Sequence, residues 1–512
     1  MRRKRLLGVI GIVAVMAASP QASGGTDPFE HGVASSATAK AAMMWTRTET
    51  PGTYLLKVSR RPSLENAIEV PVVSDAEHDN TIKRVVRGLV PNRRYFYAFY
   101  LGEQRSRFGT FKTAPWKNRP HEMELALTGD SDVLWTDHPE PQSRAFSVLD
   151  RIREDNPDLF VYMGDTIYSD SETGAEHALT LEDKWAKYKA NRLPATTELL
   201  RKVSTWAVWD DHEVINDFDG ADLAEDDPAL LQAGRQAFTD YWPVKESSFY
   251  RKVDWGSKID LLFLDERTYR SGSADGEGSP CYDEGTLDLA PQMPQEQREE
   301  LGLGPVDPEC LDHIRDPDHT ILGDEQRAWL KDRLRSKARW KLIINEVPIS
   351  QLFVRPYDRW EGFEWERNNI LNFIKKQNLK GVVFLTTDLH ANVGGRVYKD
   401  ITDQNSKPIT YEMITGPIQT CTLDCEVDDL LGFDGAGEYL HNFLVNNDLT
   451  DADCINIDHY GYGMVSAGDK AHKLRLEWRS HQPAVEGGGL PTPHCEDALL
   501  FEPDSTKPEP VE

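Results

Sequence analysis

The chain has 512 residues, of which 39% are hydrophobic, so it can form sizeable cores and two domains are expected. Its formal net charge is −27. A surface that acidic repels nucleic acid and anionic lipid head groups, which excludes both as expected partners. An anionic substrate would therefore need local positive charge, supplied by arginine or by metal ions.

Residues 1–25 have the composition of a secretory signal peptide. Basic residues at positions 2–5 precede a short apolar run, and small residues follow it. The order Arg-Arg-x-x-Leu indicates the twin-arginine export route. An uncleaved membrane anchor is the alternative. We expect an exported protein, periplasmic or extracellular, with no integral membrane association after cleavage.

Residues 26–116 have the pattern of short strands separated by turns. Aromatic residues alternate at Tyr95, Tyr97 and Phe99, and turn residues recur at short intervals. This pattern is typical of a small all-β sandwich. We predict an immunoglobulin- or fibronectin-like β-sandwich domain here.

From residue 117 the pattern changes to strands that alternate with helical segments, which predicts an α/β layer fold. We place this second domain at 117–482 and a C-terminal tail at 483–512. Helices are expected at 144–155, 324–336 and 364–377, the second capped by Asp324.

Several apolar stretches of this second domain end in polar side chains. Five of them, among them "LFVYMGDTIY" and "GVVFLTTDLH", end at Asp130, at Asp165 with Tyr168, at Asp211 with His212, at Asn345, and at Asp388 with His390. Ligands of open α/β folds bind beyond the carboxyl ends of the strands. We therefore expect these side chains to gather at one edge of the sheet.

Clustered carboxylates repel one another unless a proton or a cation neutralises them. Oxygen donors with one or two imidazoles suit Fe³⁺, Ca²⁺, Mn²⁺, Mg²⁺ or Zn²⁺. Asp388 and His390 are two residues apart, so in extended chain they would face the same side. One Gly-Asp after a strand is often only a turn, and the acidic run 217–227 is expected to be a solvated loop.

The six cysteines form an even set, which favours disulfides in an exported chain. Cys281 and Cys310 lie in one stretch rich in Pro, Gly and acidic residues, and we predict that they pair. The Cys421-x-x-x-Cys425 spacing allows a metal site or a disulfide. No second pair stands at zinc-like spacing, which favours the disulfide.

Several motifs occur in the order seen in one known family. They include "DPFEHGVASS", "GDTIYSD", "WDDHEV", "ILGDEQRAWL" and "HYGYG", and they extend from Asp27 to Arg479. The chain resembles the alkaline phosphatase D (PhoD-like) family of calcineurin-like metallophosphoesterases. The resemblance implies a sandwich of two β-sheets flanked by helices, preceded by the small β domain. It also implies hydrolysis of phosphomonoesters, often of diesters, by exported proteins that hold iron and calcium.

The resemblance also implies roles for the residues at the strand ends. Asp165 would bridge two metal ions, and His212 would contact the substrate phosphate and protonate the leaving oxygen. The other predicted ligands are Asp130, Tyr168 and His390 for one centre and Asp211, Asn345 and Asp388 for the second. Asp130 stands where many family members have Cys, which brings the site nearer to ordinary binuclear phosphatases.

The sequence thus predicts a metal-dependent phosphoric ester hydrolase that acts on small phosphate esters through a metal-bridging hydroxide. Two or more metal ions are expected: Ca²⁺ and Fe³⁺ from the resemblance, with Mn²⁺, Zn²⁺ and Mg²⁺ also compatible. One alternative is a phosphodiesterase or phospholipase D-like enzyme. A second is a non-enzymatic exported protein that binds metal or mediates adhesion.

Overall fold

The computed structural model describes residues 27–510, except for 136–144, 172, 174, 246–248, 276–278, 284–285, 301, 447–449, 469–470, 484–494, 496–497 and 504. The predicted signal peptide lies outside the described residues. Within them, no helix has both the length and the apolar character needed to cross a membrane.

The first eight strands form an all-β sandwich of two antiparallel sheets. One sheet has the order β1-β2-β5 and the other β4-β3-β6-β7, with β8 paired to β6. The strands are β1 Val33–Ala37, β2 Ala41–Arg47, β3 Gly52–Ser59, β4 Ile68–Ser74, β5 Thr81–Arg87, β6 Arg94–Leu101, β7 Gln104–Arg105 and β8 Gly109–Lys112. Tyr95, Tyr97 and Phe99 of β6 are buried between the sheets, as their alternation predicts.

Two seven-stranded sheets form the rest of the core. The first has the order β11-β10-β9-β21-β22-β23-β24, with β9, β10 and β11 parallel. Its strands are β9 Met123–Thr128, β10 Leu159–Met163, β11 Ser204–Val208, β21 His459–Ala467, β22 Leu474–Pro483, β23 Leu499–Phe501 and β24 Glu509–Pro510. The predicted tail at 483–512 is therefore wrong in part, because it supplies β23 and β24 to this sheet.

The second sheet has the order β12-β13-β16-β17-β19-β18-β20. Its strands are β12 Arg251–Trp255, β13 Ile259–Phe263, β16 Trp340–Ile344, β17 Val382–Thr386, β18 Asn392–Val397, β19 Thr410–Ile414 and β20 Ala452–Asn456. Alternate residues of the two sheets face each other: Leu125 and Val161 of the first sheet belong to one buried cluster with Leu261 and Leu342 of the second.

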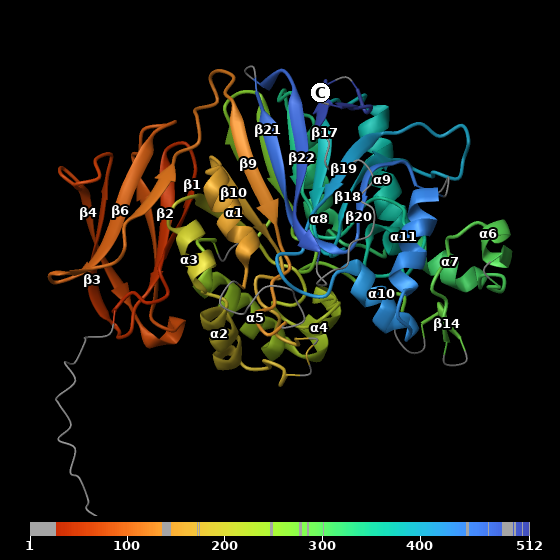
Figure 1. Cartoon of the computed structure of the whole chain (residues 1–512), viewed down its shortest axis with the longest axis horizontal. Coiled ribbons are helices and arrows are strands. Elements are labelled where there is room, and N and C mark those ends of the chain that lie inside the picture. The colour runs from red at the N-terminus through yellow and green to blue at the C-terminus, as the bar shows by residue number, and fades with distance from the viewer. Residues whose placement is uncertain are drawn as a thin grey trace, which may run out of the picture.

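Helices cover the outer face of each sheet, which confirms the predicted fold class (Figure 1). On the first sheet they are α1 Ser147–Asp155, α2 Leu181–Ala190, α3 Pro194–Leu200 and α5 Pro228–Tyr241, preceded by the short α4 Gly220–Asp226. On the second they are α8 Gly323–Leu334 and α9 Glu364–Lys376, preceded by the 3₁₀ turn η3 Trp360–Phe363. Another 3₁₀ turn, η1 Ala76–His78, lies in the β-sandwich.

The cap predicted for α8 is wrong, because Asp324 lies within the first turn of that helix. The amides at its start are bound by other groups. The carboxylate of Glu366 accepts hydrogen bonds from the amides of Ile321 and Leu322, and the hydroxyl of Thr320 accepts one from Gly323. Glu366, a side chain of α9, therefore takes the role that the local sequence assigns to Asp324.

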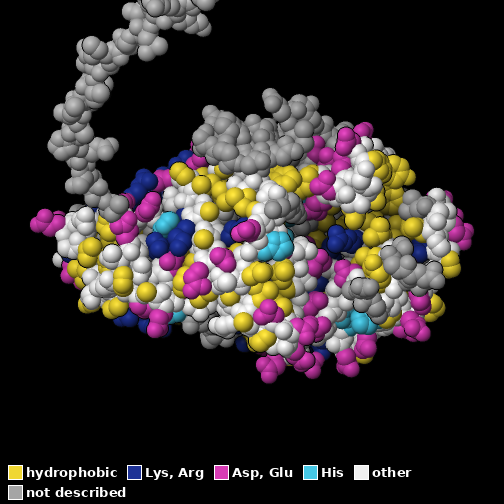
Figure 2. Space-filling view, turned by 90° about the horizontal axis from the view of Figure 1, so that it is seen from below, with side chains coloured by type: hydrophobic (Ala, Val, Ile, Leu, Met, Phe, Trp, Pro, Cys, Tyr) yellow, Lys and Arg dark blue, Asp and Glu magenta, His cyan; other side chains and the backbone are white. Residues whose placement is uncertain are grey.

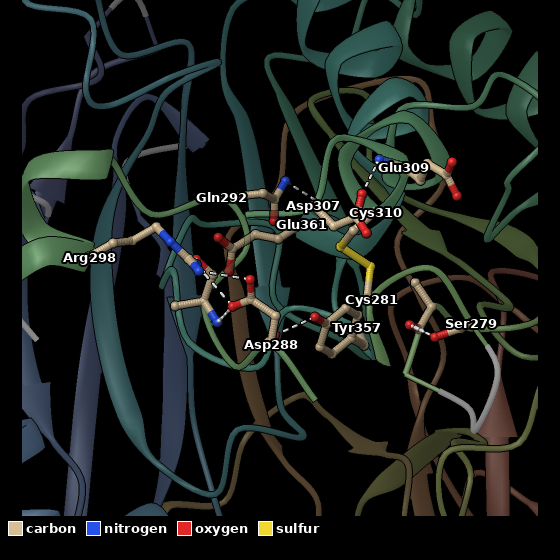
Figure 3. The surroundings of a disulfide bond; sticks show 12 residues. Ser279, Cys281, Asp288, Gln292, Arg298, Asp307, Glu309, Cys310, Tyr357 and Glu361 are labelled. Atoms are coloured by element: carbon tan, nitrogen blue, oxygen red, sulfur yellow. Dashed lines mark hydrogen bonds and ion pairs between the residues drawn. A yellow bond between two sulfur atoms is a disulfide. The ribbon is translucent and has the colours of Figure 1, made fainter. Parts of the chain in front are cut away.

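Three disulfides link the six cysteines: Cys281–Cys310, Cys421–Cys425 and Cys454–Cys495. The first confirms the predicted pair. It closes an insertion that contains β14 Tyr282–Asp283, β15 Thr286–Leu287, α6 Gln295–Glu300 and α7 Pro308–Ile314. Figure 3 shows the ion pair between Arg298 and Asp288 beside this bond, at 2.9 Å. The insertion is thus tied by covalent and ionic contacts.

Two further helices, α10 Leu423–Leu431 and α11 Ala436–Asn446, pack against each other and against the edge of the second sheet. Figure 1 places α10 near the lower side of the molecule, toward which β9 points. The chain therefore brings a helical hairpin close to the side where the central strands end.

Candidate metal centre and active site

The predicted residues come from loops that follow neighbouring strands. Asp130 follows β9, Asp165 follows β10, and Asp211 follows β11, and these three strands are parallel neighbours. Asp388 and His390 follow β17 of the facing sheet. Because the carboxyl ends of both sheets meet on one side, the loops from the two sheets bring these side chains together.

The backbone at four of these positions has a positive φ: 61° at Asp130, 47° at Asp165, 67° at Asp388 and 51° at His390. The expectation that Asp388 and His390 share a side through extended chain is therefore wrong. The strand has already ended at Thr386 and the chain turns. Non-glycine residues adopt this conformation only where the surroundings hold them there.

Gly164 allows the close approach of two of these loops. Its φ is +80°, and a Cβ at this position would lie 2.6 Å from the Cβ of Asp210. A side chain here would push the loop after β10 away from the loop after β11. The glycine thus lets Asp165 stand beside Asp211.

The first group of candidate ligands contains Asp130, Asp165 and His390, whose ligand atoms lie within 4.8 Å of one another. Neither carboxylate oxygen of Asp130 has a hydrogen-bond partner among the described residues. Burial raises the pKa of Asp130 to about 7, although the nearby His390 opposes the shift. The hydroxyl of Tyr168 lies 2.9 Å from Nε2 of His390, so the tyrosine belongs to the same cluster.

The second group joins Asp165 and Asp211 to His212, and a third joins Asp211 to Asp210 and Asp388. Burial, reinforced by neighbouring carboxylates, raises the pKa of Asp165 and of Asp388 well above the usual value. Burial also acts on Asp211, but the charges of Arg267 and His212 outweigh it and lower its pKa. The carboxylates of this cluster therefore outnumber the cationic groups beside them, Arg267 and His212.

His212 is held by a carboxylate. Its Nδ1 lies 2.6 Å from Oδ1 of Asp170, and both side chains are 7% exposed. The ring of Tyr168 stacks on the imidazole with centroids 4.0 Å apart. These contacts fix the orientation of the ring at the wall of the cavity.

Asn345 is placed differently from the other predicted ligands. Its Nδ2 donates to the carbonyl of Val347 at 2.5 Å, and its Oδ1 accepts from Nε1 of Trp360 at 3.1 Å. Its amide therefore has protein partners at both ends, and its role as a ligand stays a prediction.

A cavity of about 520 Å³ opens onto these groups and is lined by Asp165, Asp211, His212, Asp388 and His390. Seen from below in Figure 2, this face of the molecule carries hydrophobic, acidic and basic side chains around a hollow. A small molecule that enters the cavity would meet the carboxylate cluster directly.

The donor set fits a metal centre. Unpartnered buried carboxylate oxygens are costly unless a proton or a cation neutralises them, and here they stand beside imidazole and phenol groups. Oxygen donors with few nitrogens suit hard or borderline cations.

Two family models match the chain: the PhoD-like phosphatase over residues 135–476, and the N-terminal domain of the same family over residues 15–115. The chain belongs to the PhoD-like phosphatase family. It is similar to alkaline phosphatase D of Bacillus subtilis, with 26% identity over 364 residues. That match covers 64% of this chain and 56% of the relative, so it spans a little over half of the relative's length.

Two solved structures share the fold. One, described as the structure of PhoD, has a TM-score of 0.75 at 20% identity. The match covers 96% of this chain and 94% of the PhoD chain. The other is purple acid phosphatase PPD1 from yellow lupin seeds, with a TM-score of 0.51, 13% identity and coverage of 90% and 73%. At these identities the likeness concerns the fold alone.

Sequence reasoning missed one central residue of this PhoD-like site, Arg267. Its guanidinium is fully buried and forms two hydrogen bonds with Asp358, at 2.6 and 2.9 Å, and one with Asp210, at 2.5 Å. It also lies 3.7 Å from Asp211 and from Asp388. The signal was present, because "IDLLFLDER" is a sixth apolar strand that ends in charged residues.

The acidic run 217–227 was also misread as a solvated loop. Asp217 lines the cavity, and its amide donates to Oδ2 of Asp211 at 2.5 Å. Asp219 accepts from the buried Arg270 at 2.9 Å, and α4 begins at Gly220. Part of the run therefore supports the site.

Proposed function

We propose that this protein is an exported, metal-dependent phosphoric ester hydrolase that acts on small phosphate esters. The observation that carries the proposal is the buried cluster of Asp130, Asp165 and His390, with unpartnered oxygens on Asp130, in a chain of the PhoD-like phosphatase family. The three disulfides and the composition of residues 1–25 support export, for which we favour the twin-arginine route.

We assign Asp130, Tyr168 and His390 to one metal ion, Asp211 and Asp388 with Asn345 to another, and Asp165 to both. Bound metal ions would polarise the phosphoryl oxygens of the ester and lower the pKa of coordinated water. Arg267 forms ion pairs with Asp210 and Asp358 and also lies 3.7 Å from Asp211 and Asp388, so it neutralises part of the negative charge of the cluster.

His212 serves as the proton donor to the leaving oxygen in this proposal. Asp170 holds Nδ1, so we assign the proton transfer to Nε2. General acid catalysis of this kind typically contributes about 10²–10⁴ in rate.

Asp165→Asn tests the metal assignment because it keeps the size of the side chain and removes its charge. We expect metal content and turnover of an aryl phosphate monoester to fall together, by more than tenfold. His212→Ala should lose roughly 10²–10⁴ in kcat and keep its metal. Elemental analysis and steady-state kinetics measure both, with the exposed Asp150→Asn as the matched control. Full metal and full turnover in Asp165→Asn would overturn the assignment.

The metal identities are tested on the purified protein by elemental analysis together with a visible spectrum. Fe³⁺ bound by the Tyr168 phenolate predicts a visible charge-transfer band that Tyr168→Phe removes. A colourless active enzyme contradicts that pairing. Aryl mono- and diesters assayed side by side then decide which class of ester the enzyme prefers.

A further inference from the structure

The cavity of about 520 Å³ extends well beyond the candidate metal ligands. Part of its wall is formed by apolar side chains that we call the apolar compartment: Val393 and Ile455 from strands β18 and β20, Val427 and Leu430 from α10, and Leu440 and Leu444 from α11. A phosphoryl group would fill only a small part of this volume, which lies in the range of cavities that hold whole small molecules.

Helix α10 connects the apolar compartment with the part of the cavity that contains the candidate metal ligands. The amide of Leu423, the first residue of α10, donates to the carbonyl of His390 at 3.0 Å. The carboxylate of Glu426 lies 2.5 Å from Nδ1 of His390. The start of α10 therefore lies beside His390, and a ligand whose phosphate lies at the carboxylate cluster can extend its remaining atoms along this helix.

Two charged groups that line the cavity, Arg396 and Glu412, are engaged by the protein. Arg396 pairs with Asp453 at 2.7 Å and with Asp451. The carboxylate of Glu412 accepts from the amides of Ile349 and Ser350 at 3.0 and 2.8 Å. Since these groups already have partners, a molecule in the compartment would make mainly apolar contacts.

Charge limits what the apolar part of the ligand can carry. Glu426 and Asp429 of α10 line the same cavity, and the whole chain is strongly acidic. Three arginines line the cavity as well, but Arg355 lies 3.8 Å from Asp217, Arg359 lies 3.7 Å from Glu361, and Arg396 pairs with Asp451. With these cations paired, the acidic groups of α10 favour a neutral hydrocarbon chain over a second anionic group.

The apolar surface continues to the outer end of the hairpin. Leu430 is 46% exposed, Leu431 49% and Phe433 56%. Of these three side chains only that of Leu430 lines the cavity, so Leu431 and Phe433 lie outside the apolar compartment.

We propose that the apolar compartment binds the uncharged hydrocarbon part of an amphiphilic phosphate monoester while the carboxylate cluster addresses its phosphate. This inference rests on the proposed function, and it names the substrate class: esters with one phosphate and a long neutral chain.

The first test is a series of n-alkyl phosphates from ethyl to octyl, assayed by phosphate release with metal-replete protein. Each CH₂ that enters the compartment should raise kcat/KM by about two- to fourfold. An octyl chain that ends in a carboxylate should lose most of this gain. Non-hydrolysable alkyl phosphonates of the same lengths, measured by calorimetry, should show the same dependence in their affinity.

Leu430→Gln and Leu431→Gln form a matched pair on α10. The two leucines are adjacent and similarly exposed, at 46% and 49%, but of the two only Leu430 lines the cavity. Leu430→Gln should lower kcat/KM for octyl phosphate by about three- to tenfold relative to ethyl phosphate. Leu431→Gln should keep the wild-type dependence on chain length.

The outcomes separate the two proposals. Equal kcat/KM from ethyl to octyl phosphate, or equal effects of the two leucine variants, would overturn the apolar compartment and leave the hydrolase intact. Hydrolysis of none of the esters, with phosphonate affinity that still rises with chain length, would overturn the hydrolase and support the compartment.

Discussion

Asp130 is a fully buried aspartate at a positive φ, and neither of its carboxylate oxygens has a described hydrogen-bond partner of ordinary geometry, although the amide of Asp388 lies near enough to favour its charged form. A buried charge without a partner is costly, so the group must take up a proton or a cation. Its raised pKa, about 7 because of burial, expresses this cost. With Asp165, Asp388 and His390 also at positive φ, backbone strain of roughly 1–3 kcal/mol per residue is concentrated at the candidate ligands.

Gly416 offers a test of the position of the Asp130 carboxylate. A Cβ on Gly416 would lie 2.5 Å from Oδ2 of Asp130, so Gly416→Ala should displace that carboxylate. We expect metal content and turnover to fall by more than tenfold. Gly102→Ala is a control for adding a methyl group at a positive φ, because nothing lies within 4 Å of its Cβ position. The φ is 58° at Gly102 and 135° at Gly416, so Gly416→Ala also adds backbone strain. Gly102→Ala should cost roughly 1 kcal/mol in urea unfolding and keep the metal. Full metal binding in Gly416→Ala would contradict this role of Asp130.

At the scale of the elements, the residues that follow the strands were the best guide in the sequence to the location of the candidate site. The rule that ligands gather beyond the carboxyl ends of strands predicted that Asp130, Asp165, Asp211 and Asp388 would meet, and the structure brings them together. Arg267 also follows an apolar strand, but a cationic side chain does not have the character of a metal ligand. Spacing alone could not give the conformation at Asp388, because the strand ends two residues before it.

Glu213 connects two of these strand ends. Its carboxylate accepts hydrogen bonds from the amides of Thr166 and Asp210, both at 2.7 Å, from that of Asp165 at 3.3 Å, and from the Thr166 hydroxyl at 2.6 Å. It thereby holds the loop after β10 against the loop after β11.

Glu213→Gln should break part of this connection, since the new NH₂ group would face backbone N–H donors. We expect a loss of roughly 1–3 kcal/mol in urea unfolding, together with a lower kcat because Asp165 is no longer held in place. Glu154→Gln is the control. Glu154 forms an exposed pair with Arg151, so its change should stay below about 0.5 kcal/mol. Equal stabilities of the two variants would contradict the connecting role of Glu213.

At the scale of the whole molecule, the two fold classes were predictable, but the contacts between the β-sandwich and the α/β part were not. They pair residues far apart in the sequence. Nε1 of Trp45 donates to the carbonyl of Asp240 at 2.6 Å, and Arg192 lies 4.6 Å from the ring centres of Trp45 and Trp242. No local pattern marks such partners, because burial and charge at an interface depend on how the two parts dock.

Asp79 makes this docking sensitive to acid. It lies in the β-sandwich, pairs with Arg47 at 2.9 Å, and reaches across to Lys189 at 3.1 Å and to the hydroxyl of Tyr241. Burial by itself would raise the pKa of Asp79, but the hydrogen bonds from Arg47 and Tyr241 outweigh it, so the pKa is lowered. A carboxyl group whose pKa is lower in the folded state stabilises the fold above its unfolded pKa of about 3.9. That contribution disappears as the pH falls through the folded value.

Asp79→Asn should therefore be less stable than the wild type by roughly 1–3 kcal/mol between pH 5 and 8, and the difference should shrink below about pH 4. Urea unfolding followed by tryptophan fluorescence measures it. Because both proteins keep the same candidate metal ligands, protonation of that site cancels in the difference. Glu65→Gln, which alters an exposed pair with Arg61 in the same sandwich, should change stability by less than about 0.5 kcal/mol at every pH. A difference for Asp79→Asn that persists unchanged into acid would mean that shape, and not the charge of Asp79, holds the two parts together.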